Sequence, residues 1–379
     1  MRWELTSDQE FFRDTTARFL EDVVPVAEVR RLRDDPAGFD RGFWRRGAEL
    51  GWTALLVGEE RGGGSISGDG LVDLTLIAYE FGRHAAPGPL ATTNVVAAAL
   101  SDAGGGRHDD ALADLVSGEE IASWCYGEPS PGDRLGEIAL EIGVDGSDVV
   151  LRGVKRPVES ADQASAFLVT GRTGPGLTQV LVPAGAAGVS VMPMKSVDLT
   201  RRFGLVRFDD VRLPVDAVVG EIANAAAQVE RQVQIAAVLL SAESVGAMQA
   251  AFDMTVDWAF QRYSFGRPLA SYQELKHRFA DMKSWLEGAH AISDAAAVAV
   301  QADARDAAEL ASAAKAFVGQ QGVELVQDCV QIHGGIGLTF EHDVHLFLRR
   351  VTLNSALCGT AAEHRARLAA SVERRIGAA

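Results

Sequence analysis

The sequence predicts an α+β fold with an N-terminal helical domain, a central β-barrel or β-sandwich domain and a C-terminal four-helix bundle. Three observations predict it. Apolar residues recur every three to four positions before about residue 118, which indicates amphipathic helices. Short β-branched segments follow, and long Ala-rich helical patterns return from about residue 222. Because 379 residues are more than one compact core usually holds, we expect three domains, at 1–118, 119–221 and 222–379.

The first domain is predicted from one helix start and a series of helical patterns. Thr6 or Ser7 with Glu10 resembles a capping box, in which two side chains satisfy the free backbone N–H groups of a helix start. The apolar side of that helix carries Phe11, Phe12, Phe19 and Leu20. Further helical patterns span residues 42–50, 71–82 and 91–100. The glycines at 62–64 favour a flexible loop over a phosphate cradle, because no strand precedes them.

The central domain is predicted from short segments that alternate or are rich in β-branched residues, with Gly, Pro or Asp between them. They are Ile121–Tyr126, Ile138–Ile142, Val149–Val154, Ala166–Thr170, Gln179–Val182, Val189–Met192 and Leu205–Phe208. Strands of this length without intervening helices favour a small barrel or sandwich. The last domain is predicted from helices at 224–262, 271–301, 305–331 and 341–378, a pattern typical of an antiparallel bundle.

Charge and cysteine content narrow the functional classes. The formal net charge of −16 argues against nucleic acid, whose phosphates bind clustered Lys and Arg. An anionic substrate therefore needs a local basic site. The three cysteines lie far apart and in no metal-type spacing, which favours a reducing compartment over a disulfide framework. No secretory leader is visible after Met1, and the longest apolar run, near Ile235–Leu240, is too short to span a bilayer. We expect a cytoplasmic protein.

Two stretches of the last domain carry residues suited to an anionic cofactor. Arg262 precedes Gly266 and Pro268, which mark a helix end, so its guanidinium can lie over a loop and bind a pyrophosphate. Gly334 and Gly335 let a backbone approach a ligand closely. Each stretch also has an ordinary interpretation, as a surface arginine in a salt bridge and as a helix–helix turn. Their occurrence together favours a ligand that carries a pyrophosphate.

Several motifs resemble the acyl-CoA dehydrogenase family of flavoenzymes, and together they span most of the chain. In the first domain they are Gly51-Trp52, Glu59-Glu60-Arg61-Gly62-Gly63 and Glu80-Phe81-Gly82-Arg83. In the second they are Glu128-Pro129, Gly153-Val154-Lys155 and the segment from Phe208 to Pro214. The third domain carries the most specific ones, which run from Arg262 to Leu269 with Tyr272-Gln273, and from Gln331 to Gly337.

The resemblance implies FAD-dependent α,β-dehydrogenation of an acyl-CoA, or of an acyl group on a carrier protein. It also implies an electron-transfer flavoprotein as electron acceptor and a dimer or tetramer. Flavin-binding roles are implied for Arg262, Phe265, Gln273, Gln331, Gly334, Gly335, Thr360, Trp124 and Glu128. In the family, the elements around Arg262 and Gly334 reach the FAD of a neighbouring subunit.

The catalytic base departs from the family pattern. The family uses a carboxylate to remove the α proton while hydride passes to the flavin, and the usual Glu directly precedes a Gly-Thr pair. Here Cys358 precedes Gly359-Thr360, and a neutral thiol is a poor replacement. Some relatives carry the base at a position that aligns with Ala236. Glu243 lies nearly two turns further on the same helix face, and we expect it either to be the base or to pair with a buried basic residue.

The chain's own flavin site also departs from the pattern. The family usually has an aromatic residue and a Thr shortly after the middle-domain Lys, whereas Lys155 is followed by Arg156-Pro157-Val158-Glu159, and Ala362 replaces an expected Gln. The groups that reach a neighbouring flavin are kept, so two hypotheses stay open. The chain is an acyl-CoA dehydrogenase that uses Glu243, or it is a non-catalytic partner subunit of a heteromeric enzyme that completes the flavin site of another chain. A third hypothesis, oxygen activation by reduced flavin, has only the missing glutamate in its favour.

Overall fold

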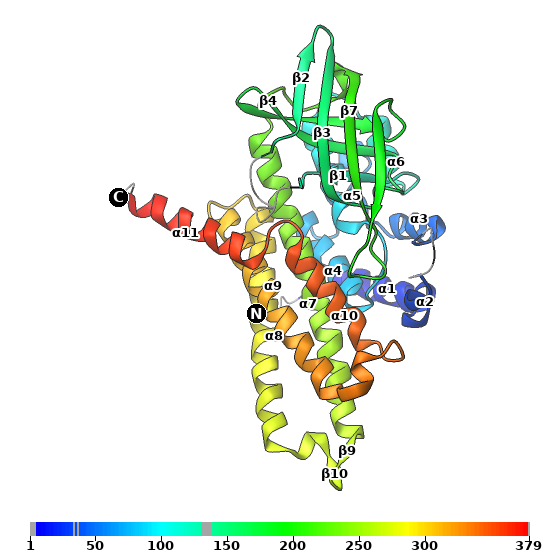
Figure 1. The fold of residues 1–379 in the computed structure, drawn as a ribbon, viewed down its shortest axis with the longest axis vertical. Helices are drawn as coiled ribbons and strands as arrows, with labels where there is room; N and C mark the ends of the chain where they lie inside the picture. Colours follow the sequence, from blue (N-terminus) through cyan, green and yellow to red (C-terminus); the bar gives the residue numbers. More distant parts are fainter. Residues whose placement is uncertain (1–4, 33–34, 36–37, 130–137, 378–379) are drawn as a thin grey trace.

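The computed structural model describes residues 5–32, 35, 38–129 and 138–377. The first four residues, considered above for a leader sequence, lie outside this range. Figure 1 shows an elongated molecule with the β-sheet at one end, long C-terminal helices that run away from the sheet, and the N-terminal helices packed against their side. The order of helices, then strands, then helices confirms the predicted fold class.

The N-terminal part is helical, as predicted. It contains α1 (Ser7–Val23), α2 (Val26–Leu32), α3 (Arg41–Glu49), the 3-10 helix η1 (Glu59–Arg61), α4 (Gly70–Arg83), α5 (Leu90–Ala103) and α6 (Asp109–Val116). A capping box opens α1, but the partner of Thr6 is Gln9 and not Glu10. Gln9 stands three residues after the cap, the position from which a side chain reaches back to the N-cap backbone N–H.

The central part is one mixed sheet. Its strands are β1 (Ala122–Cys125), β2 (Glu141–Asp145), β3 (Asp148–Glu159), β4 (Ala166–Thr173), β5 (Gly176–Pro183), β6 (Val189–Met194), β7 (Phe203–Pro214) and β8 (Val218–Val219). They follow the order β6-β7-β3-β2-β4-β5-β8, and β1 pairs with β4 in parallel. A barrel needs its first and last strands to pair, whereas β6 and β8 do not pair with each other within the described residues. The barrel alternative is wrong, because β8 holds only two residues before the chain leaves the sheet.

The C-terminal part is helical, with a short hairpin. It contains α7 (Ala226–Gln261), β9 (Tyr263–Ser264), β10 (Arg267–Pro268), η3 (Leu269–Ser271), α8 (Gln273–Gln301), α9 (Ala307–His333), η4 (Gly334–Leu338), α10 (Val344–Ala356) and α11 (Ala361–Gly377). The single helix predicted at 341–378 is therefore wrong. The chain breaks at Cys358 and Gly359, whose φ angles of 51° and 97° are left-handed. Thr360 then opens α11 through a capping box with Glu363, and α11 projects sideways from the bundle (Figure 1).

Helix α7 is the central helix of the molecule. By length and composition alone it could cross a membrane, but 89% of its apolar window is buried inside the protein. Helix α4 packs tightly on it. A Cβ on Gly82 would lie 1.8 Å from the Glu243 carbonyl oxygen, and one on Gly246 would lie 1.9 Å from the Tyr79 carbonyl oxygen. Glycine at both positions therefore lets the two backbones approach each other.

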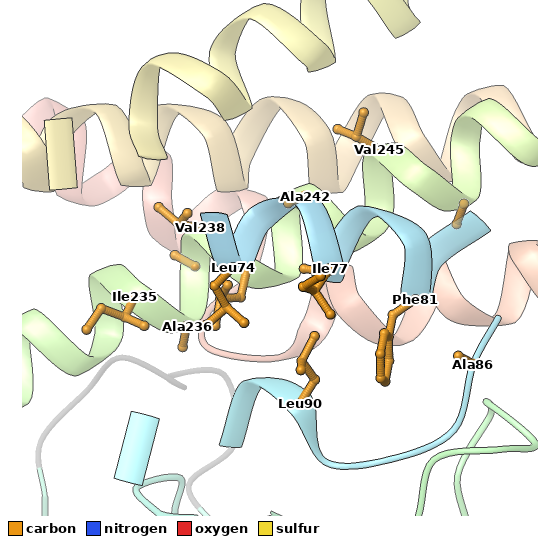
Figure 2. Close-up of a cluster of buried hydrophobic side chains, with 14 of the residues drawn as sticks. Leu74, Ile77, Phe81, Ala86, Leu90, Ile235, Ala236, Val238, Ala242 and Val245 are labelled. Atoms are coloured by element: carbon orange, nitrogen blue, oxygen red, sulfur yellow. The ribbon is translucent and has the colours of Figure 1, made fainter. Parts of the chain in front are cut away.

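Apolar side chains fill the space around this helix pair. Figure 2 shows Leu74, Ile77 and Phe81 of α4, Leu90 of α5, and Ile235, Ala236, Val238, Ala242 and Val245 of α7. These residues belong to one core cluster that runs from the N-terminal helices into the C-terminal bundle. The cluster fixes the middle of α7, and with it Glu243, against the N-terminal part.

Candidate functional site

A cavity of about 520 Å³ lies where the N-terminal helices, the sheet and the C-terminal bundle meet. Its lining includes Trp124 and Glu159 from the sheet, Lys195 and Arg201 from the connection between β6 and β7, Leu240 from α7, and Cys358. The wall is mostly apolar. A volume of this size is typical of a site for a cofactor or a small organic molecule.

Trp124 and Glu128 lie on the sheet side of the cavity. The Trp124 ring stacks on Tyr126 with centroids 4.9 Å apart, and its buried indole N–H has no hydrogen-bond partner among the described residues. Glu128 is fully engaged. It accepts a 2.6 Å hydrogen bond from Lys155 Nζ and further hydrogen bonds from two backbone N–H groups. Burial lowers the pKa of Lys155, and the Glu128 carboxylate opposes that shift. The Trp124 N–H is thus available to donate a hydrogen bond to a ligand, whereas the Glu128 carboxylate is paired with Lys155.

Glu159 and Arg201 form a tight ion pair on the cavity wall. The Nε and Nη2 atoms of Arg201 lie 2.6 and 2.7 Å from the two carboxylate oxygens of Glu159, a bidentate arrangement. Both side chains are buried. Burial alone would lower the pKa of Arg201, but the carboxylates of Glu159 and Glu243 outweigh it and raise the pKa. The pair therefore offers no free charge to the cavity.

Glu243 lies beside this pair and accepts hydrogen bonds at both carboxylate oxygens. Oε2 accepts from Arg201 at 3.1 Å and from Asn354 at 2.8 Å, and Oε1 accepts from Arg350 at 2.7 Å. A general base needs a lone pair directed at the proton that it removes. Glu243 lines a hollow of only about 10 Å³ and is not among the residues that line the large cavity. Glu243 was expected either to be the base or to pair with a buried basic residue. These contacts are those of a residue in a buried ion pair.

Arg350 extends the ion pairing across the three parts of the chain. Its Nε donates to Asp198 at 2.5 Å, and Nη2 donates to the carbonyl oxygens of Ala85 and Ala86 and to the Thr200 hydroxyl. Burial lowers its pKa, but the two carboxylates beside it outweigh burial and raise the pKa. We define the buried charge network as Glu159, Arg201, Glu243, Arg350, Asp198 and Asn354. It ties the sheet, the α4–α5 connection and the bundle together.

Cys358 and Thr360 mark the place where the resemblance locates the usual base. Cys358 lines the cavity, and burial raises the pKa of its thiol to about 11, so the thiol stays neutral near pH 7. Thr360 uses its hydroxyl at the start of α11, where it donates to the Glu363 carboxylate at 2.6 Å and accepts from the Glu363 N–H at 3.3 Å. Neither side chain supplies a carboxylate to the cavity.

The other residues expected to bind flavin lie at the far end of the bundle. We define the flavin edge as Arg262, Phe265, Gln273, Gln331, Gly334 and Gly335, all of them exposed. The ring of Trp258 stacks on His333 at 5.3 Å, which brings the end of α7 next to the end of α9. The Arg262 guanidinium has no carboxylate partner in the described part of the chain and lies 6.0 Å from the Trp258 ring. A Cβ added to either glycine would meet nothing within 4 Å. The edge is therefore open to a ligand from outside.

The cavity and the flavin edge are far apart within one chain. Leu240 lines the cavity, and Arg262 caps the same helix about six turns later, or about 33 Å along the axis. A flavin nucleotide whose ring lay in this cavity would leave the chain's own Arg262 out of reach. One flavin nucleotide therefore cannot reach both halves of the expected flavin site within a single chain.

The two places also differ in how well they fit FAD. At the flavin edge, a guanidinium that has no carboxylate partner among the described residues and two open glycines suit a pyrophosphate. In the cavity, the Trp124 N–H, which has no described acceptor, suits an acceptor atom of a ligand. However, the resemblance implies an aromatic residue and a Thr shortly after Lys155, whereas Pro157 and Glu159 line the wall there and Arg201 holds Glu159 in an ion pair. The edge fits its part of FAD, and the cavity wall does not fit the flavin ring.

Sequence reasoning did not single out Arg201, Arg350 or Asn354. One signal was available, because Arg350 and Asn354 stand four positions apart on α10 and so share a helix face with the apolar residues Phe347 and Val351. Arg201 lies in a connection without periodicity and carries no comparable signal.

Two family models match the chain. The acyl-CoA dehydrogenase N-terminal domain matches residues 6–119, and the acyl-CoA dehydrogenase C-terminal domain matches residues 226–373. Acyl-CoA dehydrogenase IpdE2 of Mycobacterium tuberculosis is 29% identical over 346 residues, which cover 90% of each chain. Acyl-CoA dehydrogenase FadE12 of the same species is 32% identical over 317 residues, 80% of each chain. The solved structure of the Tcur3481–Tcur3483 steroid ACAD has a TM-score of 0.89 at 25% identity, with 97% of this chain and 98% of that chain covered.

Proposed function

This chain belongs to the acyl-CoA dehydrogenase family of flavoprotein oxidoreductases, and from that premise we propose that it is one subunit of a heteromeric, FAD-dependent acyl-CoA dehydrogenase. The enzyme catalyses the α,β-dehydrogenation of an acyl-CoA thioester. This chain supplies its flavin edge to the FAD of a second, catalytic subunit, and that subunit supplies the base. The complex works in the cytoplasm and passes electrons to an electron-transfer flavoprotein.

The observation that carries the proposal is the environment of Glu243. Both of its oxygens accept hydrogen bonds from buried groups, two of them guanidiniums. A substrate α proton would have to displace one of these donors, and that would leave a buried guanidinium without its partner. Because Cys358 replaces the usual glutamate and Glu159 is bound bidentately by Arg201, the described part of the cavity wall offers no carboxylate free to act as base.

The flavin edge gives the chain its part in the reaction. Arg262 would bind the pyrophosphate, and the backbone at Gly334 and Gly335 would approach it. Bound FAD supplies the acceptor for the hydride that leaves the β carbon. The ring of Phe265, which is 97% exposed, would be covered by the second subunit. The similar steroid ACAD is named after two proteins, Tcur3481 and Tcur3483, which supports an enzyme built from two different chains.

A self-sufficient enzyme is the competing proposal. Its support is the cavity of about 520 Å³ and the Trp124 N–H that has no partner among the described side chains. Under this proposal the chain holds its own FAD, and Glu243 leaves the buried charge network to act as base. The two proposals predict opposite results for the chain purified alone.

The test is the flavin content of the chain purified alone and co-purified with a homologous chain encoded beside it. We expect no flavin absorbance for the chain alone, and about one flavin for each pair of chains in the complex. Arg262→Ala in this chain should weaken flavin retention by the complex roughly 10- to 100-fold, since a hydrogen bond to a charged group contributes about 1.5–3 kcal/mol.

Arg305→Ala is the matched control, because Arg305 is also exposed but lies between α8 and α9, away from the flavin edge. Unchanged flavin retention in Arg262→Ala would remove the pyrophosphate role. About one flavin per chain in the protein purified alone, reduced by an acyl-CoA, would support the self-sufficient enzyme instead.

A further inference from the structure

The large cavity carries two cations that no described carboxylate neutralises. Arg156 and Lys195 both line it, both are exposed, and neither forms an ion pair within the described residues. The two carboxylates of the lining are already paired, Glu128 with Lys155 and Glu159 with Arg201. The whole chain has a net charge of −16, so two cations beside one cavity that have no counter-charge among the described residues are a local exception. They attract an anion to it.

Behind these cations the wall is apolar. Val95, Phe203, Leu240, Leu353 and Leu357 contribute to it. Trp124 is only 7% exposed, and its indole N–H still lacks an acceptor among the described groups. A buried donor without a partner costs free energy, and a ligand oxygen would recover it. The cavity therefore suits a molecule with an apolar body and an acidic end.

We propose that this cavity binds an apolar acid as a non-catalytic ligand, with its acidic end at Arg156 and Lys195 and its apolar body inside. The proposal rests on the part of the proposed function that leaves this cavity without flavin. The acidic end lies at the exposed cations because burial of an uncompensated carboxylate is costly. A free carboxylate and the phosphates of a CoA thioester share this chemistry, and both can meet the same two cations.

The probe is dodecanoate, titrated calorimetrically into the full chain as it is purified, alone or in its complex. Arg156→Gln with Lys195→Gln, made only in this chain, should weaken dodecanoate binding about tenfold at low salt, since each exposed ion pair contributes modestly. The difference should shrink in high salt. Both side chains are exposed, so the variant should fold. Arg207→Gln is the matched control, because Arg207 is exposed on β7 and does not line the cavity; it should bind like the wild type.

Two further probes identify the chemistry. Dodecanol has the same chain without the charge, so it should bind more weakly and should not respond to the double substitution. Dodecanoyl-CoA distinguishes a free carboxylate from the phosphates of a CoA thioester. If it binds more tightly than dodecanoate and responds in the same way to the double substitution, the ligand is the thioester. If it binds more weakly, the ligand is the free acid.

Trp124→Phe keeps a ring but removes the N–H, and it should weaken dodecanoate binding a few-fold.

The inference is overturned if the double variant binds dodecanoate as tightly as the wild type, or if dodecanol binds as well as dodecanoate. Flavin content, measured on the same samples, separates this outcome from failure of the proposed function. A flavin-free chain that does not bind dodecanoate refutes only the ligand. A chain that alone carries about one flavin refutes the partner-subunit function and, with it, the premise of the ligand site.

Discussion

Arg350 and Arg262 carry the same guanidinium group in opposite environments. Arg350 is fully buried, and its guanidinium donates to two carboxylates, two backbone carbonyls and one hydroxyl. Arg262 is exposed at the end of α7, with an aromatic ring nearby and no carboxylate partner in the described chain. The first arginine has all its partners within this chain, and the second has no comparable set of partners in the described chain.

The difference follows from the cost of burying charge. A buried guanidinium must be paired and fully hydrogen-bonded, or the fold loses several kcal/mol. Complete satisfaction of Arg350, Arg201 and Glu243 therefore indicates a structural role, however much a carboxylate near a cavity resembles a base. An exposed guanidinium is hydrated and costs nothing when it is unpaired. Arg262, next to an open glycine backbone, is available for a phosphate.

The largest expected effect comes from breaking the buried charge network at Arg350. Arg350→Met fills a similar space but leaves Glu243 and Asp198 without their shared guanidinium. We expect the free energy of unfolding to fall by about 3–5 kcal/mol, as for other buried pairs that lose one partner. Thermal and urea unfolding, followed by circular dichroism, measure the loss. Arg262→Ala is the control and should change stability by less than about 0.5 kcal/mol. Equal effects at the two arginines would contradict the comparison.

Glu243→Gln decides whether the network also contains a base. Gln keeps the shape but removes the charge that two guanidiniums share, so we expect a loss of about 1–3 kcal/mol of stability. If Glu243 is structural, flavin reduction by an acyl-CoA in the folded complex should change only a few-fold. Loss of a general base should slow it by roughly 10²–10⁴. Glu230→Gln is a matched control on α7, because Glu230 lies on the surface in an ion pair with Arg367.

The sequence predicted the order of helices and strands because periodicity is a local property. It missed the break at Cys358 because the Ala-rich helical pattern continues past it, and only the left-handed backbone at Cys358 and Gly359 reveals the turn. It could not distinguish an open sheet from a barrel, since closure depends on whether the distant strands β6 and β8 meet.

The candidate functional residues also differ in whether local sequence patterns could predict them. The residues of the flavin edge were singled out from two local motifs, and the structure shows them exposed; their flavin-binding role stays a prediction. The buried charge network was not predicted. Arg350 meets Glu243 across 107 positions and Asp198 across 152, and no spacing in the sequence indicates such pairs. The sequence suggested that Glu243 needed a partner or a function, and only the fold shows which partners it has.

Glu80 provides the smallest and most specific test, because it is a buried carboxyl without the close donors that surround Glu243. It lies on α4 with Arg83 Nε 3.9 Å and His84 Nδ1 3.7 Å away. Burial raises the pKa of Glu80 from its usual 4.5 to about 7. The folded state thus binds this proton more tightly than the unfolded state does. The stability that the proton provides is complete below pH 4.5 and is lost as the pH rises towards 7.

Glu80→Gln removes this titration, so its effect on stability should depend on pH. At pH 8 the wild type must keep a buried charge, and we expect the substitution to stabilise the chain by about 1–2 kcal/mol. At pH 5 the wild-type carboxyl is mostly protonated, and the two proteins should melt at nearly the same temperature. Glu21→Gln is the control, because Glu21 lies near His84 but its side chain is 67% exposed. An effect that is equal at both pH values would show that folding does not shift the pKa of Glu80 over this range, and a loss of stability at both would show that Glu80 is ionised and compensated like Glu243. Either result would remove the distinction between buried carboxyls with close donors and those without.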